Sequence, residues 1–172
     1  MFGALLLIAF VRIERRALDP VLDLSLFKTR AFASTNAAHS LFYVSSLSLR
    51  FVLPYLVLQA LAIPATIAGL VVASIEAIRA LVSPFSGYLS DKLGSWVLAA
   101  LGTLLVGLGT LLLLTIVDTG TSIPHLVLLL SVIGLGAGLF VAPNTSRIMG
   151  SVPRPQLGTA SAMVATTRQI GS

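Results

Sequence analysis

Glu76 and Arg79 are the residues of this sequence whose types and spacing best suit proton or ion chemistry, because they stand in a long apolar stretch. Residues three positions apart share one face of a helix, so the two side chains can form an ion pair. Two unpaired charges at the centre of a hydrocarbon layer would together cost about 5–7 kcal/mol. Glu76 is therefore a candidate proton site with Arg79 as its partner. The alternative is a structural ion pair that only fixes helix packing.

A second polar group follows one face of residues 31–60. It consists of Asn36, His39, Tyr43, Ser46 and Arg50. At about 100° of rotation per helical residue, His39 and Arg50 lie about 20° apart, as do Tyr43 and Arg50. Because an arginine facing lipid is costly, we expect this stripe and Arg168 to line a water-filled cavity. The alternative is that Arg50 extends to the outer interface of the membrane.

A short polar segment separates two long apolar runs. Its sequence is Gly87-Tyr88-Leu89-Ser90-Asp91-Lys92-Leu93-Gly94. The two glycines permit a tight reversal, and the two charged residues suit contact with water. The segment is too short to form a domain, so it predicts a hinge between two antiparallel neighbouring helices.

The composition indicates an integral membrane protein rather than a soluble domain. Of the 172 residues, 56% are hydrophobic and 10% are charged, whereas a soluble domain carries about 25% charged residues. The absence of cysteine excludes disulfides, thiol catalysis and cysteine-bound metals. An intramembrane enzyme is disfavoured because the sequence contains neither HExxH nor GxSxG. We expect no metal site and no cofactor.

The apolar runs predict an all-α, polytopic transmembrane helix bundle. A helix needs about 20 apolar residues to cross the hydrocarbon layer. We expect residues 1–13 to be the end of a truncated transmembrane helix and residues 14–30 to be a cytoplasmic linker. Four complete crossings are expected at about 31–60, 65–88, 96–116 and 124–146, and residues 158–172 begin a further, truncated helix.

Glycines mark the last complete crossing. Gly134 and Gly138 form a GxxxG pattern, for which helix packing is the favoured interpretation. We expect Pro143 and Asn144 to break or bend the inner end of this helix.

The basic residues orient the bundle. The loops on one side hold Arg12, Arg15, Arg16, Lys28, Arg30, Lys92, Arg147 and Arg154, and the loops on the other side hold none. This bias places the basic side in the cytoplasm and the chain in the plasma membrane as a multi-pass protein. The pI near 10.5 could suggest a nucleic-acid partner. The distribution of the charges argues against one.

Three segments resemble the major facilitator superfamily. The polar hinge matches the loop pattern G-x-L-x-D-(R/K)-x-G at Gly87, Leu89, Asp91, Lys92 and Gly94. The pattern usually continues with a further basic residue, and Ser95 and Trp96 stand there instead. Residues 14–27 and 158–171 resemble segments of the fourteen-helix drug:proton antiporter branch. Together the three segments are spread over nearly the whole chain, from residue 14 to residue 171.

The resemblance implies that the chain is a fragment of the C-terminal half of a transporter. Its partners would be the missing N-terminal half, the lipid bilayer and a small-molecule solute. The implied function is proton-coupled export of small organic or drug-like solutes by alternating access, with the proton gradient as the energy source. Asp91 would latch the inner side. Glu76, or a residue of the missing half, would carry the proton.

The family architecture places the first and fourth crossings beside the central cavity and the third outside it. The polarity of the cavity hints at a cationic or amphipathic solute. The alternative to a transporter is a truncated membrane scaffold without transport activity of its own.

Overall fold

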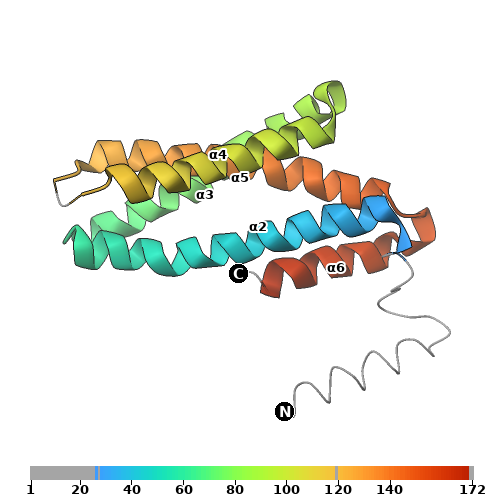
Figure 1. Ribbon diagram of the computed structural model, residues 1–172, viewed down its shortest axis with the longest axis horizontal. Helices are drawn as coiled ribbons and strands as arrows, with labels where there is room; N and C mark the ends of the chain where they lie inside the picture. Colours follow the sequence, from blue (N-terminus) through green and yellow to red (C-terminus); the bar gives the residue numbers. More distant parts are fainter. Residues whose placement is uncertain (1–25, 27, 119, 171–172) are drawn as a thin grey trace, which may run out of the picture.

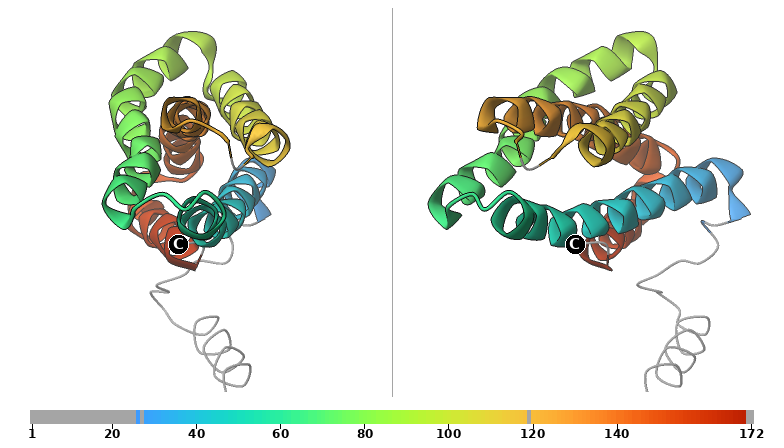
Figure 2. Two further views of the ribbon diagram at one scale, coloured as in Figure 1. Left: turned by 90° about the vertical axis from the view of Figure 1, so that its left-hand side faces the viewer. Right: turned by 60° about the vertical axis from the view of Figure 1, so that its left-hand side comes forward.

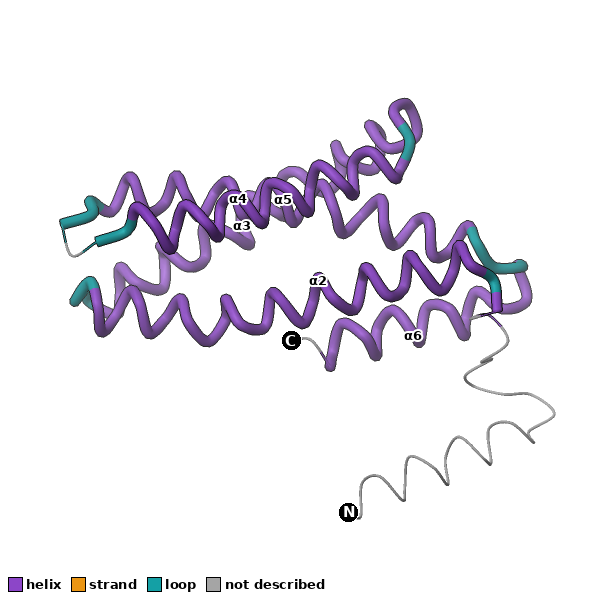
Figure 3. Tube along the Cα trace, in the orientation of Figure 1, coloured by secondary structure: helices purple, strands orange, loops and turns teal. Residues whose placement is uncertain are grey.

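The computed structural model describes residues 26, 28–118 and 120–170, which form helices joined by short loops, with no strand among them (Figure 3). Four helices are long and apolar enough to cross a membrane, which confirms the predicted all-α bundle. They are α2 (Arg30–Tyr55, prolonged by a π-helical turn at Leu56–Ala60), α3 (Ala65–Leu93), α4 (Ser95–Ile116) and α5 (Ile123–Gly150). A 3-10 turn at Arg154–Gln156 leads into α6 (Leu157–Ile170). The predicted helix at 1–13 and most of the linker at 14–30 lie outside the described residues.

Consecutive helices run in opposite directions, as Figure 1 shows. The start of α2, the α3–α4 turn and the end of α5 all lie towards one end of the molecule, which we call the inner end. Lys28, Arg30, Lys92, Arg147 and Arg154 belong to these segments or to the loop before α6. Asp118 lies in the turn between α4 and α5, at the opposite, outer end. This arrangement has the charge asymmetry of a multi-pass membrane protein.

The segment from Gly87 to Gly94 is not the polar loop that the sequence predicted. α3 continues as a helix to Leu93, beyond the predicted end at residue 88, and the chain reverses at Gly94. A glycine costs only about 1 kcal/mol in a helix interior, so Gly87 does not end α3. Gly94 has a φ of 89°, a conformation that favours glycine. Most of the predicted hinge therefore forms the last two turns of α3.

α5 approaches both of its long neighbours closely through glycines on opposite faces (Figure 2, left). Gly134 and Gly138 share one face, and Gly136 points the other way. A Cβ atom on Gly134 would lie 2.5 Å from the carbonyl oxygen of Ile75 in α3. One on Gly136 would lie 2.7 Å from the carbonyl oxygen of Gly102 in α4. Helix packing is therefore the role of the GxxxG pattern.

α2 meets the other helices at three levels along its length. Near the outer end, Leu53 joins residues of α3, α4 and α5 in one buried cluster. In the middle, Phe42 stacks on Phe140 of α5, with 4.2 Å between the ring centroids. Near the inner end, Phe32 packs in a cluster with Met163 of α6, which lies beside α2 (Figure 1). α2 is thus held at both ends and near its centre.

Substituting Gly102 by alanine should destabilise the contact between α4 and α5. The added methyl group would lie 2.6 Å from the carbonyl oxygen of Gly136, a backbone atom that cannot move aside alone. We expect a loss of about 1–3 kcal/mol in the free energy of unfolding, which is typical of overpacking. Unfolding of the detergent-solubilised protein, followed by circular dichroism, measures this change.

Gly107→Ala is the matched control, because a Cβ atom on this glycine of the same helix meets nothing within 4 Å. We expect its stability to equal or slightly exceed that of the parent, since alanine favours the helix. Equal stability of the two variants would contradict the close packing of α4 on α5.

Candidate functional site

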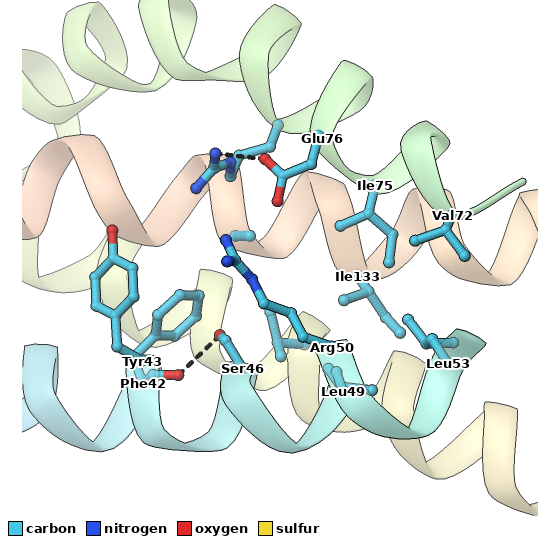
Figure 4. A pocket seen from close by; sticks show the side chains of 13 residues that line it. Phe42, Tyr43, Ser46, Leu49, Arg50, Leu53, Val72, Ile75, Glu76 and Ile133 are labelled. Atoms are coloured by element: carbon cyan, nitrogen blue, oxygen red, sulfur yellow. Dashed lines mark hydrogen bonds and ion pairs between the residues drawn. The ribbon is translucent and has the colours of Figure 1, made fainter. Parts of the chain in front are cut away.

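A pocket of about 290 Å³ lies between α2 and the other three long helices (Figure 4). Its walls are mostly apolar, with a polar edge formed by Tyr43, Ser46, Arg50, Glu76 and Arg79. The apolar lining consists of Phe42, Leu49, Leu53, Val72, Ile75, Val106, Ile133 and Ala137. The pocket therefore lies between the outer apolar cluster and the aromatic contact at the centre of α2.

Glu76 and Arg79 form an ion pair in this pocket, one turn apart on α3. The Glu76 side chain is 52% exposed and that of Arg79 is 33% exposed, so the pair borders open space rather than a packed core. Figure 4 shows the Arg50 side chain extending from α2 towards the same region. Because an opposite charge nearby lowers the cost of an ion in the membrane, this grouping explains how three charged side chains can lie inside crossing helices.

A second pocket, of about 460 Å³, adjoins the first and shares Tyr43, Arg50 and Arg79 with it. Arg168 of α6, which is near the C-terminal end of the chain, also lines this second pocket. α6 and the polar stripe on α2 therefore border the same space. The remaining lining residues are Ala80, Ser83 and Val141. The two pockets thus bring together six of the predicted site residues, namely Tyr43, Ser46, Arg50, Glu76, Arg79 and Arg168.

His39 occupies a helix contact rather than the wall of either pocket. Its side chain is 1% exposed, and its Nδ1 atom lies 3.1 Å from the Nδ2 atom of Asn144 in α5. The same amide donates a hydrogen bond to the carbonyl oxygen of Thr35, 3.3 Å away. The polar stripe predicted on α2 therefore has two parts with different surroundings. His39 in the inner part contacts α5, whereas Tyr43, Ser46 and Arg50 in the outer part line the pockets.

Asn36 lies on the side of α2 that faces α6. It is buried and borders a small hollow between the two helices, away from Arg50 and Glu76. Its Oδ1 atom, like Nε2 of His39, has no hydrogen-bond partner among the described residues. Because a buried polar atom without a partner costs about 1–3 kcal/mol, polar side chains are unusual at such buried positions of a helix contact.

The contact of Asn144 and Phe140 with the polar stripe on α2 was not predicted from the sequence. We expected Pro143 and Asn144 to break or bend the inner end of α5, and the break is wrong because the helix continues through both residues to Gly150. A polar residue four positions after a phenylalanine in an apolar helix was the available signal, because the two share a face. Both side chains meet His39, through the Asn144 amide and through stacking on Phe140.

The residues of the loop pattern, predicted to gate the inner side, lie at the inner end of α3 and in the α3–α4 turn, apart from both pockets. Asp91 and Lys92 are exposed, and the Lys92 ammonium group lies 4.7 Å from the centroid of the Tyr88 ring. The hydroxyl of Ser90 donates to that of Ser95 across the turn, with 2.9 Å between the oxygens. These contacts give the α3–α4 turn a defined shape and leave the Asp91 carboxylate on the surface.

A cysteine at Ser46 should react with a water-soluble maleimide in membranes, because the pocket would admit water. The natural chain has no cysteine, so the label reports one site. Leu104→Cys is the control, since this exposed leucine lies near the middle of α4 and belongs to neither pocket. We expect labelling at Ser46 to be at least about tenfold faster, because a thiolate forms only where its charge is solvated. Equal rates would place both positions in lipid.

Comparisons with known proteins show the family of the chain. The family model described as Major Facilitator Superfamily matches residues 1–172. The uncharacterized MFS-type transporter YhcA of Bacillus subtilis is 30% identical over 170 residues, which are 99% of this chain and 32% of that protein. The riboflavin transporter RibZ of Clostridioides difficile is 30% identical over 151 residues, or 87% of this chain and 32% of that protein.

A third relative is the multidrug resistance protein Stp of Mycobacterium tuberculosis. It is 28% identical over 163 residues, which cover 95% of this chain and 30% of that protein. The chain thus spans about a third of the length of these relatives.

Proposed function

The chain belongs to the Major Facilitator Superfamily, whose members are transporters rather than enzymes, and from this premise we propose that it forms part of a solute transporter that works by alternating access. The observation that supports this proposal most strongly is the pair of adjoining pockets that share Tyr43, Arg50 and Arg79. The smaller pocket lies between the four helices that are long and apolar enough to cross a membrane, and the larger pocket adjoins it. Secondary transporters bind solute near the middle of the bilayer, between two groups of helices that rock against each other.

We propose that the solute is a small organic molecule and that the direction of transport is export. The names of two relatives support this choice, since one is a riboflavin transporter and another is a multidrug resistance protein. The mostly apolar lining of the smaller pocket suits an organic body, and its volume of about 290 Å³ is close to the lower limit, about 300 Å³, of small-ligand sites. The resemblance to the fourteen-helix drug:proton antiporters favours export.

Glu76 is our candidate for proton coupling. Its carboxylate pairs with Arg79 and lines the pocket, so it can take up a proton from water in the same space that receives the solute. Protonation would neutralise the carboxylate and end its attraction for the guanidinium group of Arg79. Proton binding at Glu76 would thereby change the net charge of the pocket that receives the solute, which couples the two binding events.

Glu76→Gln should abolish transport driven by a proton gradient while preserving exchange of solute without a gradient. The amide keeps the shape of the side chain and removes the group that binds the proton. We expect the initial rate of gradient-driven transport to fall at least about tenfold, as for the loss of a general acid–base group. The assay uses proteoliposomes that contain a transporter of complete length with these helices.

Asp118→Asn serves as the control for this experiment, because Asp118 is a carboxylate of the outer turn that bonds within its own loop. We expect it to leave gradient-driven transport unchanged. Full gradient-driven transport by Glu76→Gln would remove Glu76 from the coupling step. A protein that moves no solute under any condition would support the scaffold alternative instead.

We further propose that Asp91 acts as a latch on the inner side of the transporter. Its exposed carboxylate stands at the inner end of α3, where it can meet the partially positive N-terminus of a helix from the remainder of the transporter. Asp91→Asn should lower the transport rate several-fold. Its free energy of unfolding should change by less than about 0.5 kcal/mol, as expected for a surface substitution.

Stopped-flow transport assays and unfolding measurements on the same preparation separate these two effects. Lys28→Gln is the control, since it removes another exposed charge near the inner end, at the start of α2. A parental transport rate for Asp91→Asn would exclude the latch.

A further inference from the structure

The charged groups that line the two pockets are unequal in sign. Among the described residues, the lining contains the guanidinium groups of Arg50, Arg79 and Arg168 and the carboxylate of Glu76. Three positive charges and one negative charge leave a net formal charge of +2. The sequence hinted at a cationic or amphipathic solute, and the placement of Arg168 beside Arg50 and Arg79 argues against the cationic alternative.

The three arginines converge from different helices on one pocket. Arg50 comes from α2, Arg79 from α3 and Arg168 from α6, and the hydroxyl-bearing residues Tyr43 and Ser83 share the wall. Guanidinium groups present several N–H donors in a plane that matches a carboxylate or a phosphate. Holding three cations together in a membrane is unfavourable unless an anion offsets them. The arrangement therefore suits an anionic ligand.

The adjoining pocket of about 290 Å³ offers a mostly apolar surface next to this charged region. Apart from Ser46 and Glu76, its lining beyond the shared residues is aliphatic or aromatic, from Phe42 at one end to Leu53 at the other. Figure 4 shows Ile75, Ile133 and Leu53 on the side of Arg50 away from Tyr43. A ligand spanning both pockets would place a polar head among the arginines and an apolar body among these side chains.

We propose that the two pockets together bind an amphipathic organic anion, with a carboxylate or phosphate head at Arg50, Arg79 and Arg168 and an apolar body between α2 and α3–α5. This inference rests on the proposed transport function and names the class of solute. Either a water-soluble organic acid or an anionic lipid offers this chemistry. Arg168 is the specificity-determining residue, because it adds the third cation and belongs to the helix after the four complete crossings.

Equilibrium binding of radiolabelled 1-naphthoate to the full chain in phosphatidylcholine nanodiscs tests the proposal. 1-Naphthylmethylamine is the matched probe, since it has the same ring and a positive head at neutral pH. We expect saturable binding of naphthoate that is at least about tenfold tighter than that of the amine. The carboxylate of naphthoate can accept charge-assisted hydrogen bonds from guanidinium groups, whereas the ammonium group of the amine is repelled by them. Tighter binding of the amine, or saturable binding of neither probe, would overturn the proposal.

Substitutions of pocket charges should shift the affinity in opposite directions. Arg168→Gln should weaken naphthoate binding about tenfold, and Arg168→Lys should restore most of it because the positive charge returns. Glu76→Gln should tighten binding by removing the negative charge. Arg154→Gln removes the same charge in an exposed turn outside both pockets, and we expect no change. Equal effects of Arg168→Gln and Arg154→Gln would contradict a role for Arg168.

Nanodiscs that contain phosphatidylglycerol distinguish the two sources of the anion. Unchanged naphthoate affinity would assign the site to a soluble acid, and competitive loss of affinity would assign it to the anionic lipid head. The result is separate from the transport proposal. A preference for the amine would overturn the anion site while leaving gradient-driven transport intact, whereas absence of transport with a retained naphthoate site would overturn only the transport function.

Discussion

The high free energy of an ionised group in hydrocarbon is the constraint on which this structure depends. Four helices are apolar enough to cross a membrane, yet α2 and α3 carry Arg50, Glu76 and Arg79 within their lengths. An arginine or a carboxylate exposed to acyl chains costs about 2.5–3.5 kcal/mol even on a lenient scale. The fold meets this constraint by gathering the charges around two adjoining pockets. The large exposed side chains of α4 are apolar and form a surface suited to lipid.

The pockets exist because α5 packs closely against α3 and α4 but lies farther from α2. Its glycines bring it against α3 and α4 at backbone distance, which leaves no room for solute on those faces. α2 meets α5 mainly through larger groups, with Phe42 stacked on Phe140 and the Asn144 amide beside His39. Large side chains at that contact separate the two helices, and beyond it, from Ser46 outwards, α2 borders the pocket. One polar stripe thus contributes to helix packing at its inner part and lines the pockets at its outer part.

Much of this arrangement follows from the sequence, and the failures have physical causes. Apolar run lengths predict the crossings, and the spacing of Glu76 and Arg79 predicts their ion pair, because both depend on local helix geometry. The division of the α2 stripe could not be predicted, since it depends on Asn144, a residue distant in the sequence. The prediction of a loop at Gly87–Gly94 was wrong, because polar residues alone do not end a helix. Only Gly94, with its positive φ, does so here.

The central claim is that Arg50, Glu76 and Arg79 face an aqueous pocket rather than lipid. A crystal structure grown in a lipidic mesophase, at a resolution that shows ordered water and acyl chains, tests it most directly. We predict water or another polar molecule beside the Glu76 carboxylate and the Arg50 guanidinium group, with acyl chains along the leucines of α4. Acyl-chain density in contact with the Glu76 carboxylate would contradict the account.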